Sequence, residues 1–147
     1  MEMDINFKQM CEYDIEKVIP LFVEYWNGTG DNWTPELVYS RIWQEMGSPD
    51  SYCLIAENGS GAVGFAMGRF ETFYDLKAYN LVEIIVAAKH QKSGVGTKIM
   101  NEIEKRVKAM GASMIQLISV NDEMHENFYG KLGYGDARNL KLKAKFL

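Results

Sequence analysis

The stretch QKSGVG at residues 91–96 lies between an apolar run, LVEIIV at 81–86, and a long segment at 94–110 with apolar residues at helical spacing. The run predicts a β-strand, and the spacing predicts an amphipathic helix. Glycines at a helix start let the backbone approach a bulky anion, and the free N–H groups of the first turn can hold phosphate oxygens. Lys92 and Lys98 add positive charge. The stretch therefore predicts a pyrophosphate site at the start of a helix.

Two common phosphate-binding motifs do not fit this stretch. The dinucleotide-binding fingerprint needs a third glycine, which is missing after Gly94 and Gly96. The P-loop needs a lysine directly after its last glycine, but Thr97 separates Gly96 from Lys98. For these residues alone, the alternative is a glycine-rich turn before an ordinary surface helix.

A second motif, VNDEMHENFYGKLGY at residues 120–134, follows one helix and one strand later. Together, the Q-x-x-G-x-G stretch and this F-Y-G-K-L-G-Y ending resemble the two hallmarks of the GNAT N-acetyltransferase superfamily. The resemblance is strong over residues 81–134, while earlier elements match in order only. The sequence departs from the family pattern at Gln91, where arginine is commoner, and at Asp122, where many members carry asparagine. The chain after Tyr134 is short, which predicts an abbreviated final hairpin.

The order of expected elements is β-α-α-β-β-β-α-β-α-β, which predicts a mixed α/β sheet. The resemblance implies the GNAT acyl-CoA N-acyltransferase fold: a central twisted mixed sheet of about six to seven strands flanked by about four helices. The expected strands are 5–10, 51–57, 62–70, 81–86, 114–120 and 140–146. The expected helices start at Asp14 and Thr34 and span 94–110 and 123–132, with a kink or break at Pro20. Without repeats or a linker, residues 1–147 read as a single acetyltransferase domain.

Composition narrows the class of protein. The 147 residues are 47% apolar, enough for one sizeable core. The net charge of −4 argues against a general nucleic-acid binder. The two cysteines, Cys11 and Cys53, form no metal-binding motif, so we expect no metal, and they fit a reducing compartment better than a disulfide. With an acidic start, no leader and no membrane-length apolar run, we expect a cytoplasmic protein.

The resemblance also assigns candidate site residues. Glu83, an acid within an apolar strand, is the candidate base, because burial raises a carboxyl pKa; the alternative is a glutamate on a wet sheet edge. Tyr129 is the candidate acid for the leaving thiolate; the alternative is a tyrosine that packs the last helix onto the sheet. A backbone N–H of the bulged fourth strand would meet the developing oxyanion. The expected contacts to acetyl-CoA are Ile85, Val86, Gln91, Lys92, Ser93, Gly94, Val95, Gly96, Thr97 and Asn121.

Fewer residues of the sequence point to the binding site of the amine acceptor. Trp33, Tyr74 and Asp75 lie on segments that border the acceptor in the family, although aromatic residues are commoner as packing. His90 adjoins the loop and could meet a phosphate, and His125 is given no catalytic role. Family members often dimerise, and strand 62–70, whose Gly and Ala leave one face bare, or the last strand could serve that purpose.

The resulting prediction is an enzyme that moves an acetyl group from acetyl-CoA to a primary amine in a ternary complex. The expected acceptor is a small cationic molecule, or less favourably a protein amine. Two alternatives remain: a non-catalytic acyl-CoA-binding sensor or interaction module, and a nucleotide-binding domain of another kind.

Overall fold

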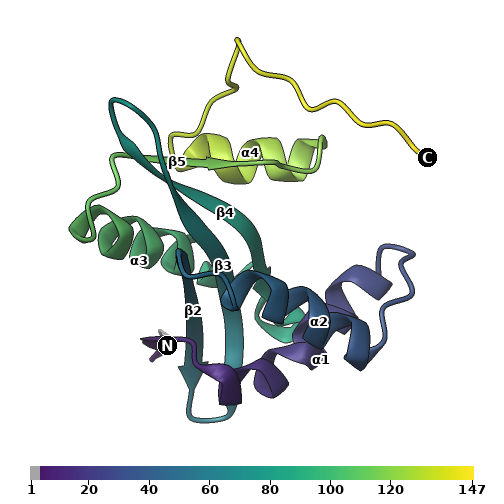
Figure 1. Cartoon of the computed structure of the whole chain (residues 1–147). Helices are drawn as coiled ribbons and strands as arrows, with labels where there is room; N and C mark the ends of the chain where they lie inside the picture. The colour runs from purple at the N-terminus through teal and green to yellow at the C-terminus, as the bar shows by residue number, and fades with distance from the viewer. Residues whose placement is uncertain (1–3) are drawn as a thin grey trace.

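A five-stranded sheet forms the centre of the computed structural model, which describes residues 4–147 (Figure 1). Its strands, in spatial order, are β1 (Asn6–Gln9), β2 (Ser51–Asn58), β3 (Gly61–Thr72), β4 (Lys77–Val86) and β5 (Met114–Leu117). The first four are antiparallel to their neighbours, and β5 is parallel to β4. The mixed sheet is confirmed, with fewer strands than the six to seven expected. Residues 1–3, part of the acidic start noted in the sequence, lie outside the described residues.

Helices cover both faces of the sheet (Figure 1). The four α-helices are α1 (Ile15–Asn27), α2 (Pro35–Met46), α3 (Val95–Ala109) and α4 (Glu123–Lys131), and the short 3-10 helices η1 (Glu12–Asp14) and η2 (Ala88–His90) precede α1 and α3. Because successive side chains of a strand point to opposite faces, the sheet contributes side chains to two hydrophobic cores, one on each face. Leu54 and Tyr79 pack with α3 and α4, while Ile55 and Phe65 pack with α1 and α2.

The helix starts follow local chemistry. Thr34 caps α2 by accepting a hydrogen bond from the Leu37 N–H at 3.2 Å, and Pro35 occupies the first helical position. The break allowed for at Pro20 does not occur, because α1 runs through it. Pro20 lies on the exposed side, as does Glu16, whose carbonyl loses its helical donor. Water can solvate that carbonyl, so the helix continues.

The bare face of β3 is filled from within the molecule. A Cβ added to Gly64 would lie 2.6 Å from Cδ1 of Ile99 in α3. A Cβ added to Gly68 would lie 2.2 Å from the backbone oxygen of Asn80. The glycines therefore allow α3 and β4 to approach β3 closely, and the prediction that this face could receive a second copy is wrong.

Residues 140–146 form no strand, contrary to the prediction from their alternating pattern. They lie in a C-terminal segment, residues 135–147, in which every side chain is exposed. Two other boundaries move. The fourth strand starts at Lys77 rather than at 81, because Ala78 and Tyr79 are fully buried, and the fifth ends at Leu117 rather than at 120.

Candidate active site

The strands β4 and β5 part in the middle of the sheet. They pair only from Ala78 with Met114 to Leu81 with Leu117, after which β5 ends and β4 continues to Val86. At the same point β4 carries a β-bulge. Met67 of β3 pairs with Glu83, but Gly68 pairs with Leu81, so Val82 is the extra residue of β4. Beyond Leu81, β4 therefore presents backbone groups to which β5 is not paired.

The start of α3 lies just beyond the end of β4 (Figure 1). Gly94 precedes the helix in a left-handed conformation, φ 85°, and no side chain caps the first turn. The helices α2 and α4, in contrast, are capped by Thr34 and Asp122. An uncapped start, with free N–H groups and the positive end of the helix dipole, fits an anionic group such as a pyrophosphate.

The loop before α3 is braced by its own side chains. Gln91 donates a hydrogen bond from Nε2 to the Val86 carbonyl at 3.2 Å, and Ser93 donates from Oγ to the His90 carbonyl. Lys92 adopts φ 61°, which is uncommon for a residue with a side chain. Val95 points into the core, so only its backbone faces the loop. Of the residues expected to hold acetyl-CoA, Ile85 and Val86 thus lie at the end of β4, and residues 91–97 form the loop and the first turn of α3.

Gly96 is the point at which this loop packs closely against the second motif. A Cβ at this position would lie 3.2 Å from Cε1 of Phe128 in α4, which is a tight contact. The ring of Phe128 lies 5.0 Å from that of Tyr129, edge to face. The glycine therefore lets α4 come close to the start of α3.

Glu83 projects from the bulged part of β4 toward the first helix. Trp26 of α1 donates a hydrogen bond from Nε1 to Oε1 of Glu83 at 3.2 Å. Burial raises the pKa of Glu83 from 4.5 to about 7, against the opposing effects of the Arg41 charge and the Trp26 hydrogen bond. A carboxyl group with this pKa can exchange protons near neutral pH.

Tyr129 lies on α4, within electrostatic reach of Glu83. Burial raises the pKa of Tyr129 to about 12, with smaller contributions from the charges of Glu83 and Tyr25. Its hydroxyl is therefore protonated at any ordinary pH. Its ring also packs on the core beside Tyr134, at 5.8 Å between ring centres. Tyr129 therefore also packs the last helix onto the sheet, as the alternative interpretation of this residue expected.

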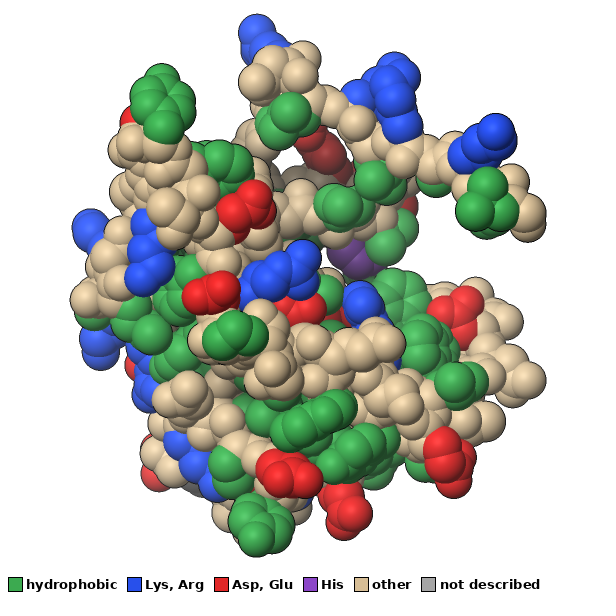
Figure 2. Space-filling view, in the orientation of Figure 1, with side chains coloured by type: hydrophobic (Ala, Val, Ile, Leu, Met, Phe, Trp, Pro, Cys, Tyr) green, Lys and Arg blue, Asp and Glu red, His purple; other side chains and the backbone are tan. Residues whose placement is uncertain are grey.

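A chain of polar side chains links α1 to α4 across this region. The hydroxyl of Tyr25 lies 3.4 Å from Nε2 of His125, and Nδ1 of His125 lies 2.6 Å from Oδ1 of Asp122. Asp122 also accepts from the His125 N–H at 2.8 Å, and these contacts lower the pKa of Asp122. Figure 2 shows a hollow on this face, with a histidine ring and both acidic and basic side chains beside it.

Sequence reasoning did not identify Tyr25, Trp26 or Arg41 as neighbours of Glu83. Tyr25 and Trp26 had a signal in the sequence, because each combines an apolar ring with a polar atom that needs a partner. Arg41 had none, since only the packing of α2 brings its charge near β4. Nothing in the sequence pairs these positions.

The expected acceptor residues do not gather in one place. Trp33 follows α1, packs edge to face on Phe22 at 4.9 Å between ring centres, and donates from Nε1 to Asp31 at 3.0 Å. Tyr74 and Asp75 lie exposed in the turn between β3 and β4, which Figure 1 shows well away from the α1–α2 connection. Asn121, which was expected to contact acetyl-CoA rather than the acceptor, is exposed just before α4.

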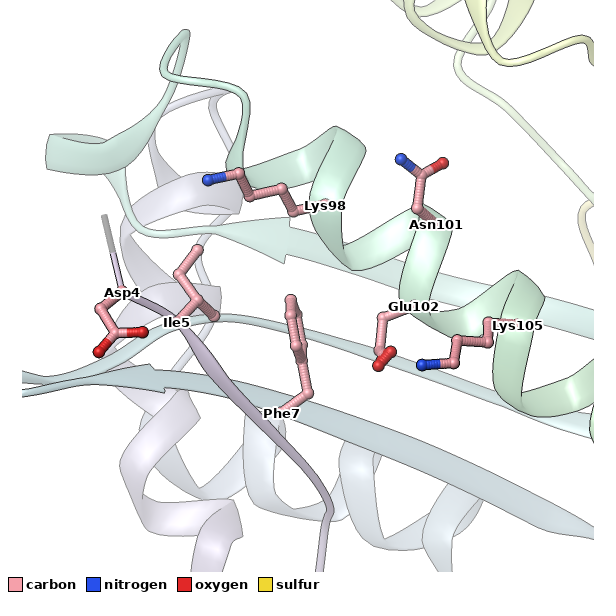
Figure 3. Close-up of a pocket in the computed structure, with 7 residues that line it drawn as sticks. All are labelled: Asp4, Ile5, Phe7, Lys98, Asn101, Glu102 and Lys105. Atoms are coloured by element: carbon pink, nitrogen blue, oxygen red, sulfur yellow. The ribbon is translucent and has the colours of Figure 1, made fainter. Parts of the chain in front are cut away.

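A separate hollow of about 520 Å³ lies between β1 and α3 (Figure 3). Figure 3 shows Ile5 and Phe7 on its strand side and Lys98 and Asn101 on its helix side. It is wide open, and neither Glu83 nor Tyr129 lines it. The candidate base Glu83 lies instead where β4 and β5 part.

Two other features are absent from the part of the chain that the structure describes. Within residues 4–147, no group of three or more His, Cys, Asp or Glu side chains is arranged to hold a metal ion. Across the same described residues, no helix has the length and apolar character needed to cross a membrane.

Solved structures share this fold. A transcriptional regulator from Bacillus halodurans is 19% identical, with a TM-score of 0.79 and coverage of 97% of this chain and 100% of that one. A GNAT family acetyltransferase from Staphylococcus aureus is 18% identical, with a TM-score of 0.75 and coverage of 99% and 100%. An aminoglycoside N-acetyltransferase in complex with CoA is 14% identical, with a TM-score of 0.78 and coverage of 99% and 97%.

The family is identified by comparison of the amino-acid sequence with known families. No curated protein matches it. The family described as the acetyltransferase (GNAT) family, however, matches residues 15–134, which include both motifs and the four helices. The chain therefore belongs to the GNAT family and is an acetyltransferase that uses acetyl-CoA as its acetyl donor.

Proposed function

We propose that this protein transfers the acetyl group of acetyl-CoA directly to the primary amine of a small cationic molecule, with both substrates bound at once. The observation that carries the proposal is the position of Glu83, a half-buried carboxyl with a pKa of about 7 on the bulge where β4 parts from β5. An acceptor bound there meets a base that is ionised at neutral pH and can still take up a proton.

Acetyl-CoA supplies an acetyl thioester, and this chain offers two surfaces to hold it. The pyrophosphate would meet the uncapped N–H groups at the start of α3, from Gly94 to Gly96. The pantetheine arm would pair with the backbone of Ile85 and Val86 as an added strand does. Gln91, which donates to the Val86 carbonyl, keeps this loop next to the strand end.

Glu83 takes the proton that the amine must lose. The bound ammonium first loses one proton to Glu83, which returns it to water. The amine nitrogen then forms a bond to the thioester carbon, the carbon–sulfur bond breaks, and a second proton passes from nitrogen to Glu83 directly or through water. The Trp26 hydrogen bond and the Arg41 charge both favour the ionised carboxylate, and burial opposes it. This balance keeps the base ready near neutral pH.

Tyr129 assists the leaving sulfur as a hydrogen-bond donor. A phenol with a pKa of about 12 does not give its proton fully to a thiolate, whose reference pKa is ~8.5. The charge of Glu83 contributes to that raised pKa, so protonation of Glu83 makes the phenol a better donor just as the thiolate forms. The thiolate then takes its proton from water.

Charge in the site favours a cationic acceptor. Glu83 and Asp122 both face the region between α1 and α4. Burial raises the pKa of Tyr25 there, and the charges of these two carboxylates raise it further. An ammonium group gains from such carboxylates, and the chain as a whole carries a net charge of −4. The solved aminoglycoside N-acetyltransferase with this fold is consistent with a polyamine or an aminosugar as the first acceptors to test.

The test is a thiol-release assay with acetyl-CoA and a panel of polyamines, aminoglycosides and amino acids. Glu83→Gln should lower turnover by a factor of about 10²–10⁴ without weakening acetyl-CoA binding in calorimetry. Tyr129→Phe should lower turnover less, and Tyr13→Phe, at a residue 87% exposed, is its matched control. Unchanged turnover in Glu83→Gln would remove Glu83 as the base, and absence of acetyl-CoA binding in the wild type would refute the proposal.

A further inference from the structure

Three polar side chains, which we call the Tyr25–His125–Asp122 triad, connect the last turn of α1 to the first turn of α4. The hydroxyl of Tyr25 lies 3.4 Å from Nε2 of His125, and Nδ1 of His125 lies 2.6 Å from Oδ1 of Asp122. Tyr25 and His125 are 100 residues apart in sequence, so they meet only because the two helices are placed side by side in the fold. Neither of them has a part in the chemistry proposed above.

The contact with Asp122 determines which ring nitrogen of His125 carries the hydrogen. Asp122 accepts from the backbone N–H of His125 and contacts its ring, and these interactions lower the pKa of Asp122. An ionised carboxylate can only accept hydrogen bonds, so Nδ1 is the donor in this contact. In the neutral ring, Nε2 is then an acceptor.

The hydroxyl of Tyr25 is therefore the donor in its contact with His125. Burial raises the pKa of Tyr25, so the hydroxyl keeps its proton and can donate it. A hydroxyl oxygen that donates its hydrogen in one direction still has lone pairs with which it accepts from another. The triad thus leaves the Tyr25 oxygen as a hydrogen-bond acceptor toward any further group that approaches it.

This oxygen lies in the surroundings of the candidate base. Trp26, the next residue of α1, donates from Nε1 to Oε1 of Glu83 at 3.2 Å. The Trp26 ring packs edge to face on Tyr25, at 5.0 Å between ring centres. After burial, the charge of Glu83 raises the pKa of Tyr25, and Tyr25 adds to the raised pKa of Tyr129. An amine that reaches Glu83 therefore also comes near the Tyr25 oxygen.

A primary ammonium group matches these two acceptors. It carries three N–H donors, so one can point to the Glu83 carboxylate and another to the Tyr25 oxygen. An alcohol carries one O–H donor and can satisfy only one of the two. A buried acceptor left without a donor costs free energy, so the pair favours an amine over an alcohol.

We propose that Tyr25 binds the acceptor ammonium beside Glu83, and that His125 and Asp122 are positioning residues that hold the Tyr25 hydroxyl in its donating orientation. This role of Tyr25 rests on the proposed function, because it requires an amine bound at Glu83. Tyr25 keeps its proton throughout, so the triad makes and breaks no covalent bond.

The tautomer of His125 can be measured without any acceptor. The chain has two histidines, so the nitrogen NMR spectrum of ¹⁵N-labelled protein contains two imidazole rings, and His125→Gln identifies the ring of His125. At about pH 8, where an ordinary histidine is neutral, Nδ1 of His125 should carry the hydrogen and Nε2 should not. Asp122→Ala should remove this preference. A hydrogen on Nε2 in the wild type would overturn the positioning roles.

Kinetics with the amine that the wild type acetylates best test the role of Tyr25. Tyr25→Phe should raise the KM of the amine about tenfold or more, because a hydrogen bond to a charged group is lost. The kcat and the KM of acetyl-CoA should change by less than about threefold, since this bond is made before and during the reaction. Tyr13→Phe, at an exposed tyrosine, should leave all three values unchanged.

A double variant distinguishes positioning by His125 from a merely structural role. His125→Ala should raise the amine KM less than Tyr25→Phe does, and the two changes together should be no worse than Tyr25→Phe alone, since His125 acts through that hydroxyl. Circular dichroism and acetyl-CoA binding establish that each variant is folded. Additive effects of the two changes would overturn the positioning role of His125.

Failure of this proposal and failure of the proposed function give different results. If the wild type acetylates amines and Tyr25→Phe keeps the wild-type amine KM, the role of Tyr25 is wrong and the proposed function stands. If the wild type binds acetyl-CoA but acetylates no amine, both are wrong.

Discussion

Replacement of Glu83 by glutamine should make the protein more stable at neutral pH although it lowers turnover. Burial raises the pKa of this carboxyl from 4.5 to about 7, so the folded state disfavours its charge. Between these two values the folded protein binds more protons than the unfolded chain. The free energy of unfolding therefore falls as pH rises through this range. At 1.36 kcal/mol per pKa unit, the full penalty is about 3 kcal/mol.

The neutral amide of Glu83→Gln avoids this penalty and can still accept the hydrogen bond from Trp26. We expect the variant to exceed the wild type by about 3 kcal/mol at pH 8, about 2 kcal/mol at pH 6 and about 1 kcal/mol at pH 5. For a domain of this size the gain at pH 8 corresponds to roughly 6–12 °C in Tm. Urea unfolding followed by tryptophan fluorescence measures the difference at each pH.

Glu24→Gln is the matched control, because Glu24 is an exposed residue of α1 and undergoes the same change of charge. It should leave stability within about 0.5 kcal/mol of the wild type at every pH. An equal stability of Glu83→Gln and the wild type at pH 8 would refute the reasoning. A difference that stays constant from pH 5 to pH 8 would do the same, because it could not come from titration of the carboxyl.

Two further predictions follow from contacts around the site and the sheet. Trp26→Phe removes the donor that stabilises the Glu83 carboxylate, so the acid limb of kcat/KM should move up by as much as about 1 pH unit; a limb that stays in place would contradict this. Gly68→Ala would put a Cβ 2.2 Å from the Asn80 carbonyl and should cost more than about 2 kcal/mol in urea unfolding, whereas Gly59→Ala, with open space around it, should cost less than about 1 kcal/mol.

Much of the fold was predictable because its signals are local. Apolar residues at helical spacing predicted α3, and Thr34 followed by Pro35 predicted the start of α2. The strands expected at 51–57 and 62–70 are neighbours in sequence, and they form the hairpin of β2 and β3, in which Asn58 pairs with Gly61. These signals depend on backbone preference and on side-chain period, which neighbours in sequence determine.

The family was also within reach of the sequence, since it depends on two short motifs. The glycines at 94 and 96 and the ending at 128–134 occur at fixed distances, and the match over residues 15–134 agrees with them. Glu83 was found because an acid within an apolar strand is unusual. The value of its pKa could not be predicted from the sequence, because that value depends on which groups surround the carboxyl.

Only the tertiary structure decided what surrounds Glu83 and what becomes of the chain end. Trp26 and Arg41 come from helices far away in sequence, and their hydrogen bond and charge act on Glu83 only because the helices pack on that face of the sheet. Residues 140–146 have the pattern of a strand and yet pair with no strand in the described part of the chain. A side-chain period describes what a strand would bury, whereas pairing requires a partner edge at the right place in space.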